Sequence, residues 1–222
     1  MGGTKIALLD YLRQEREAVV SKLDGLSERD RRRPLTGTGT NLLGLVKHLV
    51  GIETGYLGEC VGRPPREPLP WYADGSVWDG ADMWATEEES TEYVVGLYRA
   101  AWEHSDRNIE DLDLDTPATV GWWSEDERET NLGTLLVRVL VDTARHAGQA
   151  DIVRELIDGR RGSDQQSFGD EQGVALLRRA DRASGEGFRG VSCQPTGTSV
   201  GSARCLPPAS SGWRDSALGH HM

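Results

Sequence analysis

The sequence has 222 residues, a length that favours one sizeable domain with an appendage over two large domains. Its formal net charge of −11 disfavours nucleic acids and anionic lipid surfaces as partners, because binding either requires clustered Lys and Arg. No apolar run approaches the roughly 20 residues that span a bilayer, and the first residues become charged before a secretory signal could form, so we expect a cytoplasmic protein with no membrane partner.

Four segments of the chain repeat apolar residues every three to four positions, which is typical of amphipathic helices. The first helix is expected from Thr4 to about Leu26. The second is expected to start from a cap at Thr40 or Asn41 and to run to Cys60, where the stretch GRPPREPLP stops it. Cys60 itself is expected to be a buried structural thiol.

Two further helices are predicted in the second half of this region. The third is expected to be capped by Thr86, with three glutamates in its first turn, and to end near Asn108. The fourth is expected to open at Thr130 or Asn131 and to end before Gly159, a residue type that often follows a helix.

Four such helices and no convincing strand predict an all-α protein, a four-helix bundle with long crossover loops, in residues 1–162. Residues 163–222 carry no net charge and are rich in Gly, Ser and Pro, so we expect a low-complexity, disordered tail there. A short helix over 173–183 is an alternative for part of this tail, and a read-through origin is an alternative for all of it.

The two long loops hold most of the tryptophans. One alternative is that these rings cap an end of the bundle as part of its core. The other is that they form the wall of a ligand pocket, and one ring can do both. The residues concerned are Trp71, Trp78, Trp84, Trp122 and Trp123.

Two histidines suggest a metal site. His48 lies between apolar turns of the second helix, so its imidazole is expected to face the interior, and Asp142 precedes His146 by four residues and shares its helix face. These three side chains are candidate ligands with positions left open for water or substrate, as in catalytic zinc sites, although iron, manganese or nickel would also fit. Spacing alone leaves an alternative, in which Asp142 pairs with Arg138 or Arg145 and the histidines are hydrogen-bonded core residues.

Three stretches of the chain carry a family resemblance. The second helix reads PLTGTGTNLLGLVKHLVGIETGYLG, the following linker reads WYADGSVWDGADMW, and the fourth helix reads DTARHAGQADIVRELIDG. Over about residues 4–161 the sequence resembles the DinB and YfiT-like superfamily of metal-binding four-helix bundles, and most closely an actinobacterial branch of unknown function. The resemblance implies His48, Asp142 and His146 as the metal ligands, with Gln149 inside the motif of the fourth helix.

Two positions depart from the pattern of that superfamily. Asp142 stands where Glu is usual, so a bound ion would lie closer to the fourth helix or bind more weakly. Arg138 stands where the nearest branch often has His, and its guanidinium could either pair with Asp142 or hold an anionic substrate.

Enzymes of similar fold transfer the thiolate of a small thiol to an electrophile, or use the thiol as the cofactor of an isomerisation. The resemblance thus implies a metal-dependent thiol S-transferase or isomerase, with zinc as the expected metal, mycothiol as the thiol, a small electrophile as substrate and a homodimer as the assembly. Arg138 and Gln149 are then candidate catalytic residues, and Arg145, Trp122 and Trp123 are candidates for the thiol site. Arg145 could instead be a solvated surface residue, and Gln149 could bond a helix neighbour.

Two other functional classes compete with this interpretation. One is a non-catalytic metal-binding or stress-associated bundle, in which the ion only stiffens the helices. The other is a non-haem iron(II) oxygenase, which rests on the ligand set alone. Glu53 is expected in a salt bridge or at the surface rather than as a general base. Motifs for nucleotide binding and for serine hydrolysis are missing from the sequence.

Overall fold

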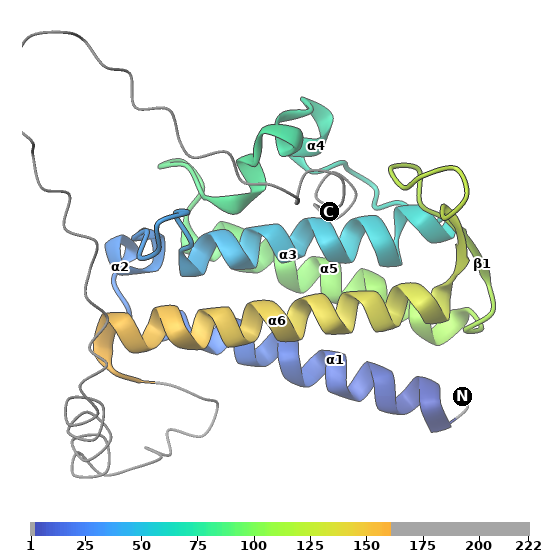
Figure 1. Cartoon of the computed structure of the whole chain (residues 1–222), viewed down its shortest axis with the longest axis horizontal. Coiled ribbons are helices and arrows are strands. Elements are labelled where there is room, and N and C mark those ends of the chain that lie inside the picture. Colours follow the sequence, from blue (N-terminus) through green and yellow to red (C-terminus); the bar gives the residue numbers. More distant parts are fainter. Residues whose placement is uncertain (1–2, 161–222) are drawn as a thin grey trace, which may run out of the picture. The chain divides into compact units, whose positions relative to one another are not determined.

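The computed structural model describes residues 3–160, so the expectations about the tail concern residues outside the described range. The described chain is mostly helical, and α6 lies alongside both α1 and α3, while α3 also packs against α5 (Figure 1). The four long helices are α1 (Gly3–Ser21), α3 (Leu42–Leu57), α5 (Thr91–Asp111) and α6 (Leu132–Asp158).

One short helix lies between α1 and α3, and four more lie in the long linker after α3, which passes over α3 in Figure 1. They are α2 (Glu28–Arg32), η1 (Glu59–Val61), α4 (Pro70–Ala73), η2 (Ser76–Asp79) and η3 (Ala81–Met83).

The prediction that the chain contains no strand is wrong in the loop between α5 and α6. There β1 (Pro117–Thr119) and β2 (Glu129–Asn131) pair antiparallel, with Pro117 opposite Asn131. Three residues per strand are too few to produce a recognisable alternation of apolar and polar side chains. The hairpin brings the loop back to the start of α6.

Several predicted helix boundaries hold, because side-chain caps define them. The side chain of Asn41 accepts a hydrogen bond from the backbone nitrogen of Gly44 at 2.7 Å, and that of Asn131 accepts one from Thr134 at 2.9 Å. At its other end α6 closes at Gly159, whose φ of 78° is the left-handed conformation that glycine adopts without strain.

Other boundaries differ from prediction. Helix α1 ends at Ser21 rather than near Leu26, and α3 ends at Leu57 rather than at Cys60. Helix α5 begins after Ser90, whose hydroxyl caps it, and not after Thr86. Both residue types cap helices well, so local sequence does not decide between them.

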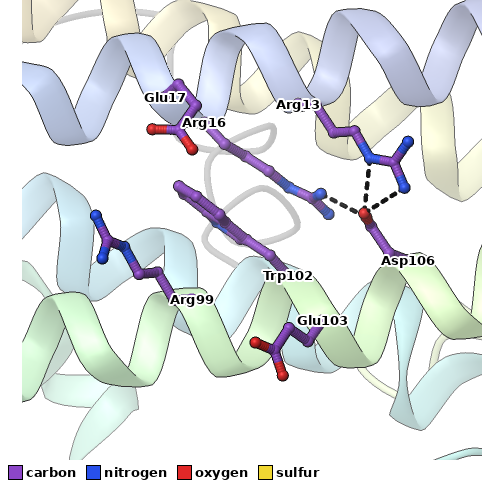
Figure 2. A pocket seen from close by; sticks show the side chains of 7 residues that line it. All are labelled: Arg13, Arg16, Glu17, Arg99, Trp102, Glu103 and Asp106. Atoms are coloured by element: carbon purple, nitrogen blue, oxygen red, sulfur yellow. Dashed lines mark hydrogen bonds and ion pairs between the residues drawn. The ribbon is translucent and has the colours of Figure 1, made fainter.

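Helix α3 forms the centre of the core, because all 16 of its residues are buried. On the side facing α1, Glu53 accepts two hydrogen bonds from the Arg16 guanidinium, at 2.6 and 2.7 Å. The guanidinium also reaches Asp106 of α5, which in turn binds Arg13, as Figure 2 shows at the wall of a surface pocket. The expected salt bridge of Glu53 is therefore confirmed, and it ties α1, α3 and α5 together.

None of the helices in residues 3–160 combines the length and the apolar character needed to cross a bilayer.

Candidate metal site

Three predicted ligands converge between α3 and α6. His48 on α3 and the pair Asp142 and His146 on α6 each offer one donor atom, and these atoms all lie within 4.8 Å of one another. The Nε2 atoms of His48 and His146 lie 3.8 and 3.7 Å from Asp142 Oδ2. The sequence prediction that these three residues share one site is compatible with this geometry.

Helix packing accounts for the convergence. Residues four apart lie on one face of a helix, so Asp142 and His146 both point from α6 toward α3, against which α6 packs. The two imidazole rings meet edge to face, with centroids 5.0 Å apart and planes at 78°. This arrangement directs both Nε2 atoms to the same carboxylate oxygen.

The donor set fits a divalent cation. Asp142 Oδ2 is buried, yet within the described part of the chain it has no hydrogen-bond partner, a condition that costs roughly 1–3 kcal/mol. A cation would satisfy this oxygen. Zinc bonds of about 2.0–2.2 Å place tetrahedral donors roughly 3.3–3.6 Å apart, so the two histidine–Asp142 separations of 3.8 and 3.7 Å require only small adjustments despite the short Asp side chain.

The second nitrogen of each imidazole is also held. His48 Nδ1 lies 2.6 Å from Asp82 Oδ2, and His146 Nδ1 lies 2.8 Å from Gln149 Oε1. Because both partners present oxygens, each Nδ1 carries the proton and donates it, which leaves the lone pair on Nε2 facing Asp142. Both histidines are thus in the tautomer that binds a metal through Nε2.

Burial favours the neutral form of His146. Its pKa is lowered below the usual value of a histidine, chiefly because the ring is removed from water and secondly because of His48, while the Asp142 carboxylate acts in the opposite direction. A neutral imidazole is the form that binds metal ions. The site therefore presents His146 ready for binding near neutral pH.

Arg138 forms no hydrogen bond with the buried Oδ2 atom of Asp142, which has no such partner within residues 3–160. Its guanidinium lies over two rings, 4.9 Å from the centroid of Tyr56 and 5.1 Å from that of Trp123.

A family model described as mycothiol-S-transferase matches residues 7–159, more than half of the chain. The chain belongs to the mycothiol-S-transferase family. This agrees with the predicted DinB and YfiT-like superfamily. No curated protein matches the chain significantly.

In this mycothiol-S-transferase family member, the other predicted site residues lie at different depths. Gln149 is exposed and bonds His146, which favours the predicted helix-neighbour role, and Arg145 is exposed, as a surface residue would be. Trp122 and Trp123 are half-buried and pack on Tyr56, to whose hydroxyl Trp122 Nε1 donates at 3.3 Å.

The three tryptophans of the linker after α3 differ in exposure. Trp71 is buried in the core at 2 % exposure, as a capping residue would be, whereas Trp78 and Trp84 are 65 and 56 % exposed. Of these three rings, Trp71 is the one that lies in the core.

Asp82 was not predicted as a site residue. It shares the linker with Asp74 and Asp79, which are exposed, and nothing in the local sequence separates the three. Its position becomes apparent only when η3 folds onto α3 and brings the carboxylate to His48, 34 residues earlier in the chain.

Proposed function

We propose that this chain is a metal-dependent thiol S-transferase that joins mycothiol, or a similar small thiol, to a small electrophile. The observation that carries the proposal is the convergence of His48, Asp142 and His146 around a buried carboxylate oxygen that lacks a hydrogen-bond partner among the described residues. Membership of the mycothiol-S-transferase family supports the choice of thiol chemistry. We interpret the four long helices of residues 1–162 as the four-helix bundle of that superfamily.

His48, Asp142 and His146 are the residues that would hold the cation, and zinc is the metal we propose, with iron, manganese or nickel as alternatives. When bound, a divalent cation supplies Lewis acidity that lowers the pKa of a thiol and keeps the thiolate available near neutral pH. The transfer is a nucleophilic substitution. The thiol loses its proton to water, and its sulfur donates an electron pair to form a bond to the electrophilic carbon. The leaving group departs with the electron pair of the bond that breaks.

Other residues of the chain would orient the substrates. Arg138 is proposed to hold an anionic group of a substrate, since its aromatic neighbours fix the guanidinium one helical turn before Asp142. Trp122 and Trp123 are proposed to shield the site from water, Gln149 to orient His146, and Arg145 to contribute positive charge at the surface.

We further propose a cytoplasmic homodimer. Helix α6 exposes four apolar side chains, Val137, Val141, Ile152 and Leu156, at 42 to 61 %. Such a face would be covered by a second copy of the chain, and light scattering coupled to size-exclusion chromatography measures the mass that decides this point.

The proposal is tested by elemental analysis of natively purified protein, followed by an assay of thiol consumption with mycothiol and monobromobimane, in which a C–S bond forms and bromide leaves. Zinc together with transfer that is lost in His146→Ala supports the S-transferase. Metal without turnover supports the non-catalytic bundle, and iron with oxygen uptake supports the oxygenase. A mycothiol-dependent rearrangement without net thiol loss supports an isomerase.

A further inference from the structure

We propose that Asp82 is a positioning residue of this metal site, an inference that rests on the proposed function. Its carboxylate holds the His48 ring in the orientation and tautomer that direct Nε2 to the ion, and strengthens metal binding by doing so. The residue that controls the ligand on α3 therefore comes from the linker and not from either helix of the site.

The contact itself is short and sheltered. Asp82 Oδ2 lies 2.6 Å from His48 Nδ1, and the two side chains are only 9 and 11 % exposed. A carboxylate accepts but does not donate, so Nδ1 must carry the proton and Nε2 the lone pair. Carboxylate partners of this kind also make a ligand imidazole more basic, and their removal typically lowers metal affinity roughly 10- to 100-fold.

Hydrogen bonds attach the linker segment 81–89 to the start and the middle of α3, and they restrain the position of Asp82. Asn41 donates from Nδ2 to the carbonyl of Met83 at 3.2 Å, and Lys47 donates from Nζ to the carbonyl of Trp84 at 3.1 Å. Gly44 allows the close approach, because a Cβ there would lie 1.8 Å from the Met83 carbonyl oxygen. These donors lie seven residues and one residue before His48, and they hold the two residues that directly follow Asp82.

A second set of bonds holds the far end of the same segment. The Arg32 guanidinium donates to the carbonyls of Ala85, Thr86 and Glu89 at 3.1, 2.7 and 2.6 Å. The carboxylate of Glu89 also pairs with Lys47 at 2.8 Å. With the residues that follow Asp82 attached in this way, its backbone has little freedom to withdraw from His48 on that side.

The two ligand histidines are supported unequally. Gln149, the partner of His146, is exposed and neutral, whereas Asp82 is buried and acidic. Loss of a buried charged partner costs more than loss of an exposed neutral one. We therefore expect Asp82→Ala to weaken metal binding more than Gln149→Ala does.

Two measurements test the inference in the full chain. Titration with Co²⁺ and Zn²⁺ gives the affinity and the visible spectrum of the cobalt form for the wild type and for Asp82→Ala, Asp82→Asn and Gln149→Ala. Side-chain ¹⁵N NMR of the metal-free protein, assigned with His48→Gln, distinguishes the protonated from the unprotonated nitrogen of His48. The matched control is Asp79→Ala, which removes the same charge from an exposed position of the same linker.

We expect affinity to fall roughly 10- to 100-fold in Asp82→Ala, less in Asp82→Asn, whose amide oxygen still accepts from Nδ1, and not at all in Asp79→Ala. The cobalt spectrum should change, and the Nδ1-protonated tautomer of His48 should lose its dominance in Asp82→Ala. Folding is checked by circular dichroism, and Asp82→Asn provides the test if Asp82→Ala does not fold.

Affinities within twofold of wild type in both Asp82 variants, or an unchanged tautomer in Asp82→Ala, would overturn the inference. A wild-type protein that binds neither ion would instead refute the proposed function, and with it the role of Asp82 in metal binding. The NMR result on the metal-free protein keeps these two failures distinguishable.

Discussion

Replacing Asp142 by Asn should have opposite effects on the metal-free and the zinc-loaded protein. In the metal-free protein the substitution removes a buried charge whose Oδ2 atom lacks a hydrogen bond within residues 3–160. The amide that replaces the carboxylate is of equal size and can donate to the Nε2 atom of either histidine. In the loaded protein the same change removes an anionic ligand.

The size of each effect follows from the burial of the site and from mass action. An unsatisfied buried acceptor costs roughly 1–3 kcal/mol, and because the Asp142 side chain is 30 % exposed we expect a gain of at most about 1 kcal/mol in the free energy of unfolding. Zinc at 100 times Kd stabilises the wild type by about 2.7 kcal/mol. A 100-fold weaker affinity reduces this to about 0.4 kcal/mol at the same zinc concentration.

Differential scanning calorimetry with and without zinc measures both effects. At roughly 2–4 °C per kcal/mol, the wild type should gain about 5–11 °C in Tm with zinc, and Asp142→Asn about 1–2 °C. Asp113→Asn, which alters an exposed carboxylate, should behave as the wild type does. Two results would contradict this expectation: an Asp142→Asn protein that keeps the full zinc-dependent shift, or a metal-free form that is less stable than the wild type by more than about 1 kcal/mol.

Three further predictions concern positions outside the ligand set. Gly44→Ala should lower the free energy of unfolding by about 1–3 kcal/mol, because the added Cβ would meet a linker carbonyl. Gly96→Ala, on an open face of α5, should raise the free energy of unfolding by about 0.5–1 kcal/mol. Equal effects of the two substitutions in calorimetry would contradict this prediction. Burial raises the pKa of the Cys60 thiol to about 12. The buried thiol therefore contributes fully to stability below the ordinary thiol pKa of about 8.5, and this contribution declines as the pH rises further. Iodoacetamide at pH 8.5 should modify Cys60 only after the protein unfolds, which peptide mass spectrometry can establish. Arg16→Met should lower the free energy of unfolding, measured by urea denaturation, by about 3–5 kcal/mol, because Glu53 would remain buried without its cation. Adding Glu53→Leu to this variant should restore part of the lost stability. A loss below about 1 kcal/mol in Arg16→Met would contradict a stabilising ion pair.

The parts of the fold that sequence could predict are those set by local contacts. The ends of α6 were predictable because Asn131 and Gly159 are strong capping residues that act within a few positions of themselves. The start of α5 was not, since Ser90 and Thr86 are comparable caps and Glu89 is engaged with Lys47 on another helix. Where two residues are equally good caps, tertiary contacts decide which of them begins the helix.

The candidate site divides in the same way. Asp142 and His146 could be paired from their four-residue spacing alone, and the apolar turns around His48 indicated its inward direction. Asp82 could not be predicted, because its burial depends on the path of the linker across α3. The stacking of Arg138 on rings from α3 and the hairpin loop depends on similarly distant contacts.

The ion pair of Glu53 has a consequence for His48, which lies five residues earlier on the same helix. Glu53 is bound on the side of α1 and α5, while His48 is bound on the side of the linker and α6, so bonds in different directions oppose any rotation of α3 about its long axis. Rotation of α3 about its axis, which would move the His48 imidazole, would have to break the buried contact between Arg16 and Glu53. Substitutions at Arg16, remote from the donor atoms, should therefore alter the selectivity of the site among ions of different radius.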